Sequence, residues 1–583
     1  MDPVTLAVVR GALEQIADEM DLHLIHAAIS PIISETNDCA HGIFLPDTGE
    51  TVAQGRFGLP VFLANMQFTV QNLIGHVATE GGFQPGDVWI MNDPYRSGTH
   101  LQDVVLVAPH FVDGKLFALL ASTGHWMDIG GSVPGGWAPS AQDIHTEGLV
   151  IPPVKLYESG TLNRALVSMF TGNVRLPTEI EGDMFAMANV FHVGRRGLDA
   201  LVERYGSETL AACITEMNDR SEQQMRSYIE EIPDGTYFHE DFMDNDGIVD
   251  EPIRIALSLT VKGSSLHFDF SQSDPAARGP LNLARSTTQS TCFIALKHIF
   301  SEVPVNGGAF RPTSFDIREG SVVSAAYPSP VSGYLEPIGR VFDVVLGALA
   351  QAIPERTPAP AFGTVGVVTA GGRHPDTGNY FVAVFPYPGG YGGHSHGDGL
   401  VNGTPPVSMA NFMSIEASEH RYPLQFDEYA LRPDSGGAGK FRGGCGTQYK
   451  FRAMSEFVVS VLGDRQDHLP FGIAGGEPAA PSIVRFGIDG KDMRPPMRSK
   501  AEKQKLRPGD WLFAASPGGG GFGNPLDRTL DLVQEDLDLG YISRQTAEEV
   551  YRAVVRSETS PNGAERLIVD IAASEERRRG KVA

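Results

Sequence analysis

The sequence predicts a multidomain α+β protein in which a long N-terminal helix and a helical C-terminal segment flank a strand-rich body. Three observations predict this class. Apolar residues recur at helical spacing over residues 4–29 and again over residues 189–232. Short apolar or alternating runs such as DVWIMN, VVLVAPHF and SLHFDFSQ, separated by Gly, Asp and Pro, dominate the rest. Helices and strands are grouped instead of alternating regularly, which favours α+β over α/β.

The 583 residues allow about three to four domains. The second helical stretch ends at the turn PDGTYF, and a later helix is ended by Pro354. After residue 527 the segments DLVQEDLDLGYI and SRQTAEEVYRAVVR are expected to be helical. The predicted regions are an N-terminal region with the candidate site (1–190), a helical segment (191–235), a strand-rich central body (236–525, with a helix over 339–355) and a helical C-terminal segment (526–583).

Composition and charge exclude several classes of protein. The 66 Gly and 40 Pro residues have no period, which excludes collagen and indicates a turn-rich fold. A net charge of −25 argues against binding to nucleic acid or to an anionic membrane. Four widely spaced cysteines fit a reducing compartment. With no signal peptide and no apolar run long enough to span a membrane, we expect a cytoplasmic protein.

The glycine-rich segments do not predict a nucleotide site. DSGGAGKFRGG lacks the Ser or Thr that follows Lys in a P-loop. PGGGGFGNP contains GxGxxG, but no second strand follows to complete a βαβ unit, so a structural turn is favoured. A third segment, GGYGGHSHGDG, holds His394, His396 and Asp398, and could bind metal, cover a cleft or form a solvated loop.

The stretch NDPYRSGTHLQDVV and the later STGHWMDIGG suggest a metal site. His100 and Asp103 lie where a Gly-containing loop enters a strand, and His125 follows the next strand. Because positions i and i+3 of a regular strand face opposite sides, His100 and Asp103 can meet only through a bulge or an irregular loop. Asp38 could complete a set of N and O ligands suited to Zn²⁺, Mn²⁺ or Fe²⁺. The alternative is that these are ordinary turn-capping, solvated side chains.

Several longer segments resemble the hydantoinase B/5-oxoprolinase family, which includes metal-bearing subunits of acetone and acetophenone carboxylases. They are SETNDCAHGIF, GDVWIMNDPYRSGTHLQDVVLV, GHWMDIGG, EGLVIPPVKLY, RPDSGGAGKFRGG and LRPGDWLFAASPGGGGFGNPLDR. The family's THxxD motif falls on His100 and Asp103, and the histidine before DxGG falls on His125. Asp38 matches the aspartate of an ERxDFS-like segment that here reads ETNDCA, without the Arg and Phe. GGYGGHSHGDG also departs from the family's GGxGARP-like residues.

The resemblance implies the B subunit of an ATP-dependent enzyme that opens a small cyclic amide, such as a hydantoin, an oxoproline or a larger lactam. A large ATP-binding hydantoinase A-type subunit would hold ATP and Mg²⁺, in a hetero-oligomer of α2β2 type, and phosphorylate the amide oxygen. A divalent metal on Asp38, His100, Asp103 and His125 would then activate water. Asp128 could orient His125, and His145 or Glu147 could shuttle protons, unless all three only cap turns.

Two other functions remain open at this point. The same site could serve a ketone carboxylase of the acetone or acetophenone type, acting on a phosphorylated enol with bicarbonate or CO₂. The chain could also be a non-catalytic scaffold for the ATP-binding subunit.

Overall fold

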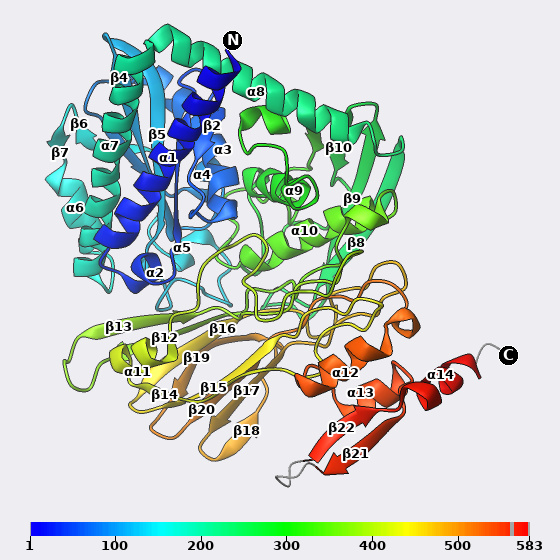
Figure 1. Cartoon of the computed structure of the whole chain (residues 1–583). Helices are drawn as coiled ribbons and strands as arrows, with labels where there is room; N and C mark the ends of the chain where they lie inside the picture. The colour runs from blue at the N-terminus through cyan, green and yellow to red at the C-terminus, as the bar shows by residue number, and fades with distance from the viewer. Residues whose placement is uncertain (1, 560–564, 581–583) are drawn as a thin grey trace.

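The computed structural model describes residues 2–559 and 565–580 and confirms an α+β architecture with several sheets (Figure 1). The predicted N-terminal helix is α1 (Pro3–Ala27). Asp2 caps it by accepting a hydrogen bond of 2.8 Å from the Thr5 N–H, and Pro3 occupies its first turn. Its apolar stripe, which includes Leu6, Val9 and Leu13, is buried, so tertiary packing stabilises the helix.

A seven-stranded sheet forms the centre of the N-terminal region, in the order β2-β1-β5-β4-β3-β6-β7. Alternate residues of its central strands belong to two different apolar clusters, so both faces of the sheet are buried. This explains why the strands are nearly continuous apolar runs. The strands are β1 (Cys39–Phe44), β2 (Thr51–Gln54), β3 (Val88–Met91), β4 (Asp103–Val112), β5 (Lys115–His125), β6 (Val154–Glu158) and β7 (Thr161–Leu162).

Helices cover both faces of this sheet. One cluster includes α1 and α7, and the other includes α3 and α9. Helix α3 lies in a stretch that the sequence analysis interpreted mainly as strand, and that interpretation is wrong there. The helices up to residue 229 are α2 (Pro31–Ser34), α3 (Pro60–Thr79), α4 (Pro94–Ser97), α5 (Ile144–Glu147), α6 (Arg164–Thr171), α7 (Pro177–Tyr205) and α8 (Ser207–Ile229).

A four-stranded sheet with two long helices follows, in the order β11-β10-β9-β8. The alternation predicted for SLHFDFSQ is confirmed in β10, but the helix α9 was not predicted. Helix α9 is buried nearly all round, so its sequence lacks an amphipathic period. The elements are β8 (Gly235–Met243), β9 (Ile253–Lys262), β10 (Ser265–Asp269), α9 (Arg285–Ile299), β11 (Thr313–Asp316) and α10 (Leu335–Leu349). Helix α10 is the helix predicted over 339–355, but it ends at Leu349, and Pro354 begins a separate 3-10 turn instead of ending the helix.

The strand-rich part is a sandwich of two sheets, at the bottom of Figure 1, ordered β13-β12-β16-β19 and β14-β15-β20-β17-β18. Residues from both sheets share one apolar cluster, so the sheets pack face to face. The elements are β12 (Val367–Arg373), β13 (Tyr380–Phe385), α11 (Ile415–Arg421), β14 (Leu424–Leu431), β15 (Thr447–Ala453), β16 (Phe457–Leu462), β17 (Ile483–Ile488), β18 (Lys491–Met493), β19 (Lys500–Leu506) and β20 (Trp511–Ala515).

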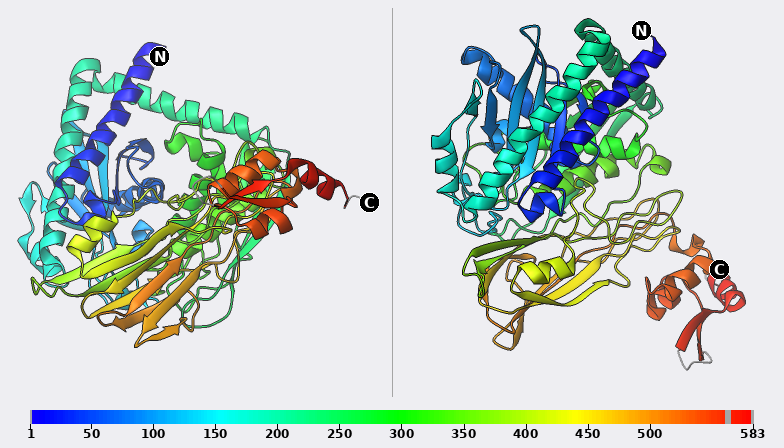
Figure 2. Two further views of the ribbon diagram at one scale, coloured as in Figure 1. Left: turned by 60° about the horizontal axis from the view of Figure 1, so that its bottom comes forward. Right: turned by 60° about the vertical axis from the view of Figure 1, so that its left-hand side comes forward.

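The C-terminal segment lies at the edge of the molecule in Figures 1 and 2. Its helices confirm the predicted helical character, but SRQTAEEVYRAVVR is helical only at its start, because the chain then pairs as a hairpin. Residues 560–564 and 581–583 of this segment lie outside the described residues. The elements are α12 (Leu530–Asp538), α13 (Arg544–Glu549), β21 (Val555–Thr559), β22 (Glu565–Val569) and α14 (Ile571–Arg579).

The predicted domain limits stay predictions, and the packing bears on two of them. Residue 190 lies within α7. One apolar cluster runs from α3 and the seven-stranded sheet into β9 and α10, across residue 235. The N-terminal sheet and the region up to α10 therefore share a hydrophobic core, whereas the sandwich has its own.

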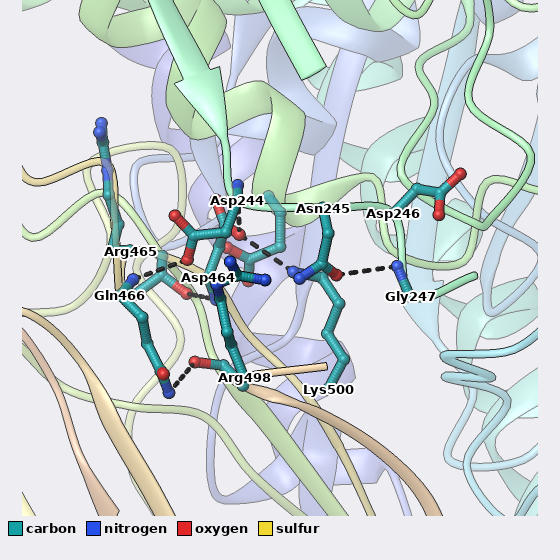
Figure 3. A network of polar contacts seen from close by, with 12 residues as sticks. Asp244, Asn245, Asp246, Gly247, Asp464, Arg465, Gln466, Arg498 and Lys500 are labelled. Carbon is teal, nitrogen blue, oxygen red and sulfur yellow. Dashed lines mark hydrogen bonds and ion pairs between the residues drawn. The ribbon is translucent and has the colours of Figure 1, made fainter. Parts of the chain in front are cut away.

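A buried network of charges joins the sandwich to α10 and β8. Figure 3 shows the part of it around Asp464, Arg465 and Lys500. Arg340 of α10 bonds Asp464 at 2.5 Å, and Lys500 of β19 bonds the same carboxylate at 3.0 Å. Arg465 pairs with Asp241 of β8 at 2.7 Å and with Asp343 of α10. These side chains are buried, so each charge depends on its partners.

Much of the glycine content lies in extended segments packed backbone to backbone. The Gly393 N–H donates to the Gly520 carbonyl at 2.9 Å, and the Gly437 N–H donates to the Gly519 carbonyl at 2.8 Å. In the segment with GxGxxG, every backbone N–H from Gly518 to Gly523 donates to a neighbouring carbonyl. These amides are therefore unavailable for a phosphate, in agreement with the structural role expected for this segment.

We expect Gly519→Ala to destabilise the protein by about 3 kcal/mol, because overpacking forces backbone shifts. The added Cβ would lie 2.0 Å from the Tyr391 carbonyl oxygen and 2.4 Å from the Gly392 nitrogen. Thermal unfolding of both proteins measures the effect. Gly11→Ala in α1 is the control, since nothing lies within 4 Å of its Cβ and Ala favours a helix. A Gly519→Ala protein that melts at the wild-type temperature would contradict this packing.

Candidate metal centre

The pairing of β4 with β5 brings the two strand-end residues together. Asp103 begins β4 and lies directly opposite His125, the last residue of β5. His100 precedes the strand in a turn, and its carbonyl accepts the Asp103 N–H at 3.2 Å. The irregular loop expected for the three-residue spacing is therefore present.

His100, Asp103 and His125 form a compact buried cluster. His100 Nε2 lies 3.0 Å and His125 Nδ1 lies 2.9 Å from Asp103 Oδ1. One ligand atom from each residue lies within 4.8 Å of the others. Burial opposes ionisation of Asp103, but His100 and His125 hold its pKa well below the usual value. An ionised carboxylate between two imidazoles is the chemistry of a divalent-cation site.

Asp38 lines the cavity beside these three residues but is not part of the compact cluster. It comes just before β1, and its carbonyl accepts the His125 N–H at 3.0 Å. Burial raises the pKa of its carboxyl to about 7, with His125 lowering it and Asp103 raising it. Asp38 lines the same cavity as the three clustered residues.

The residues present fit a divalent cation. Three of their buried polar atoms, Asp38 Oδ1, His100 Nδ1 and His125 Nε2, have no hydrogen-bond partner in the described part of the chain. Leaving such atoms unpaired in a folded protein is costly, and a cation or a ligand removes that cost. The N and O donor set suits Zn²⁺, Mn²⁺ or Fe²⁺.

Two aromatic residues that the sequence analysis did not identify enclose the imidazoles. Trp137 stacks on His125, with ring centroids 5.0 Å apart. Tyr334 packs on His100 at 4.7 Å, and its hydroxyl donates to Asp103 Oδ2 at 3.2 Å. Tyr334 immediately precedes α10, and its distance along the chain from the motif explains why no local pattern indicated it.

The other three predicted site residues lie outside the cluster and do not line its cavity. Asp128 accepts hydrogen bonds from the Arg175 backbone N–H at 2.7 Å and from the Arg175 guanidinium at 2.8 Å. The carboxylate that contacts the His125 ring is that of Asp103, not that of Asp128. Exposed His145 contacts the Tyr327 hydroxyl at 2.9 Å.

Glu147 is buried and accepts the N–H groups of Val331 and Ser332 at 3.1 and 2.7 Å, which ties α5 to the chain before α10. Burial raises its pKa to about 8. In GGYGGHSHGDG, Asp398 pairs with Arg528 at 2.7 Å. A bridge between His394 and Gly397 closes a turn that contains His396, and both histidines are exposed. The contacts of Glu147 and Asp398 are thus those of structural anchors.

A cavity of about 710 Å³ opens onto the cluster. The clustered residues are buried, whereas Glu35 and Glu416, which also line it, are exposed, so the cluster lies at its inner end. The volume is typical of small-molecule sites. The apolar part of the lining includes Phe62, Leu335, Val365, Val367, Val384 and Met413.

No helix within residues 2–559 and 565–580 combines the length and the apolar character needed to cross a membrane.

The fold and the buried cluster define a multidomain α+β protein with a compact group of two histidines and an aspartate at the inner end of a cavity. The sequence profile of the hydantoinase B/oxoprolinase family matches residues 2–525, and the chain belongs to this family. It is 32% identical over 572 residues to caprolactamase subunit beta of Pseudomonas jessenii, covering 95% of this chain and 96% of that protein.

Two solved structures share the fold. The crystal structure of ATP-dependent caprolactamase from Pseudomonas jessenii matches with a TM-score of 0.89 and 31% identity, covering 99% of this chain and 100% of that chain. Nucleotide-free acetone carboxylase matches with a TM-score of 0.90 at 19% identity, covering 100% of this chain and 83% of that chain, which shows a common fold.

We expect the wild-type chain to retain a stoichiometric divalent metal after dialysis, and His100→Ala and Asp103→Asn to lose it, because each removes a ligand. Elemental analysis measures the metal, and circular dichroism checks the fold. His192→Ala, on the exposed face of α7, is the control and should keep the metal. Full metal content in both cluster variants would contradict the assignment.

We expect Tyr334→Phe to weaken metal binding by about tenfold or more, because Asp103 loses the hydroxyl that orients it. Competition with a chelating dye measures the affinity. Tyr327→Phe, an exposed tyrosine whose hydroxyl contacts His145, is the matched control. Equal affinities for the two variants would show that the Tyr334 hydroxyl does not support the ligand.

Proposed function

We propose that the chain is the B subunit of an ATP-dependent hydrolase that opens small cyclic amides. The observation that carries this proposal is the buried cluster of His100, Asp103 and His125 at the inner end of a 710 Å³ cavity, in a member of the hydantoinase B/oxoprolinase family. The relative named caprolactamase subunit beta supports both the reaction type and a partner subunit.

The activating step belongs to the partner in this proposal. An amide carbonyl is a poor electrophile, and phosphorylation of its oxygen by ATP makes the carbon open to attack by water. The glycine-rich segments have used their backbone N–H groups in mutual hydrogen bonds, which supports placing ATP and Mg²⁺ on a large hydantoinase A-type subunit. We propose a hetero-oligomer of α2β2 type in the cytoplasm, where the four buried cysteines would stay reduced.

His100, Asp103 and His125 would hold a divalent cation, with Asp38 as a further ligand; Zn²⁺, Mn²⁺ and Fe²⁺ all suit them. Such a cation, when bound, lowers the pKa of water and polarises a carbonyl or phosphoryl oxygen. Tyr334 orients Asp103 through its hydroxyl. Trp137 and Tyr334 cover the imidazole rings and exclude bulk water, which strengthens electrostatic interactions at the site.

The purified chain with its partner subunit and ATP should open a lactam or hydantoin ring, and His100→Ala should reduce the rate by about 10³-fold or more, because the cation is lost. Product formation is followed by chromatography. His192→Ala is the control and should turn over like the wild type. Full activity of a metal-free His100→Ala complex would instead indicate that this chain is a non-catalytic scaffold for the ATP-binding subunit.

A ketone carboxylase is the second candidate, since acetone carboxylase shares the fold. The same complex is supplied with acetone or acetophenone and labelled bicarbonate. Stable label in a carboxylated product, without ring opening of any amide, would contradict the hydrolase. Turnover by this chain alone, without ATP, would contradict the division of labour between the subunits.

A further inference from the structure

The charges that line the cavity are unbalanced. Apart from the metal cluster and Asp38, its charged lining residues within the described part of the chain are Glu35 and Glu416, and no Lys or Arg is among them. A ligand that enters therefore meets carboxylates and no Lys or Arg side chain in the described lining.

The two glutamates come from different parts of the chain that meet at the outer end. Glu35 follows α2, and Glu416 lies in the first turn of α11. The Asn411 N–H donates to the Thr36 carbonyl at 2.9 Å, which joins the two segments. Both glutamates are exposed, and neither forms an ion pair with any residue of 2–559 or 565–580. Their charges are therefore not neutralised by the protein.

The remainder of the lining suits a neutral ring. Val365, Val367 and Val384 offer hydrocarbon surface for methylene groups. Asn402, whose Oδ1 accepts the Tyr429 hydroxyl at 3.2 Å, offers an uncharged amide. The valine side chains can contact the methylene groups of a lactam or an imide, and the amide can hydrogen-bond its ring amide. None of these groups neutralises the negative charge of a carboxylate.

We propose that this cavity selects cyclic amides without a carboxylate, so that neutral lactams and hydantoins are preferred to rings of the 5-oxoproline type. This inference rests on the proposed function and names its substrate class. A carboxylate would lose hydration on entry, find no Lys or Arg, and pass two like charges. Discrimination by repulsion of this kind gives specificity without added contacts to the preferred substrate.

The test uses the complex of this chain with its partner subunit, ATP, and ring substrates in matched sets. For the five-membered lactam the set is 2-pyrrolidinone, 5-oxoproline and 5-oxoprolinamide, in which the last has the size of 5-oxoproline without its charge. Hydantoin and the six- and seven-membered lactams are assayed with their own carboxylate and carboxamide derivatives. We expect kcat/KM to be about tenfold or more higher for each carboxamide than for its carboxylate.

Charge-neutralising variants connect the preference to this chain and not to the partner subunit. Glu35→Gln and Glu416→Gln should each raise the ratio of carboxylate to carboxamide kcat/KM by about twofold to fivefold, because exposed charges interact weakly. Glu419→Gln on the same helix is the control. It lies outside the cavity lining, its Gln can still accept the Phe426 N–H, and the ratio should not change.

The outcomes separate the inference from the function beneath it. Any carboxylate ring opened as well as its carboxamide would overturn the proposed selectivity while confirming the hydrolase. A ratio unchanged in both glutamate variants would overturn the role given to this cavity. No ATP-dependent opening of any ring would contradict the proposed function, and the inference would fall with it.

Discussion

The arrangement of the site depends on the buried charges around Arg340 and Asp464. Although burial alone would raise it, Lys500 and Arg340 lower the pKa of Asp464 to about 2, so the carboxylate is ionised. Arg465 completes the network with carboxylates from β8 and α10. Separating the sandwich from α10 would leave these charges buried without partners, which is strongly unfavourable. The network therefore restricts how the two parts can be placed relative to each other.

Helix α10 also connects this network to the cluster of His100, Asp103 and His125. Arg340 lies in α10, and Tyr334, which bonds Asp103, immediately precedes that helix. Between them, Glu336 accepts the N–H groups of Val365 and Gly366 at 3.2 and 3.1 Å. Val365 lines the cavity. The short stretch from Tyr334 to Glu336 therefore positions both the hydroxyl that donates to Asp103 and one wall of the cavity. The cluster residues come from the N-terminal sheet, but the structure around them depends on α10.

Sequence reasoning succeeded where a signal is local and failed where it is not. The helical spacing of residues 4–29 predicts α1, and a short motif placed His100, Asp103 and His125 where β4 and β5 bring them together. Buried α9 shows no amphipathic period to distinguish it from strand. Tyr334 and Trp137 become neighbours of the histidines only through tertiary packing. Asp128 and Glu147 share the sequence neighbourhood of His125, yet their carboxylates are used by Arg175 and by backbone N–H groups.

The glycine-rich segments and the cavity together favour a division of the reaction between two subunits. A nucleotide site needs backbone N–H groups free to face phosphates. Here the amides from Gly518 to Gly523 bond neighbouring carbonyls, and a Cβ at Gly519 or Gly443 would overlap backbone atoms. The glycines thus allow chains to pack closely instead of binding phosphate. The cavity, without Lys or Arg in its described lining, is equally unsuited to a triphosphate. In the proposed reaction, activation with ATP therefore falls to the partner subunit, and this chain would contribute the metal ligands and a largely apolar cavity for the ring.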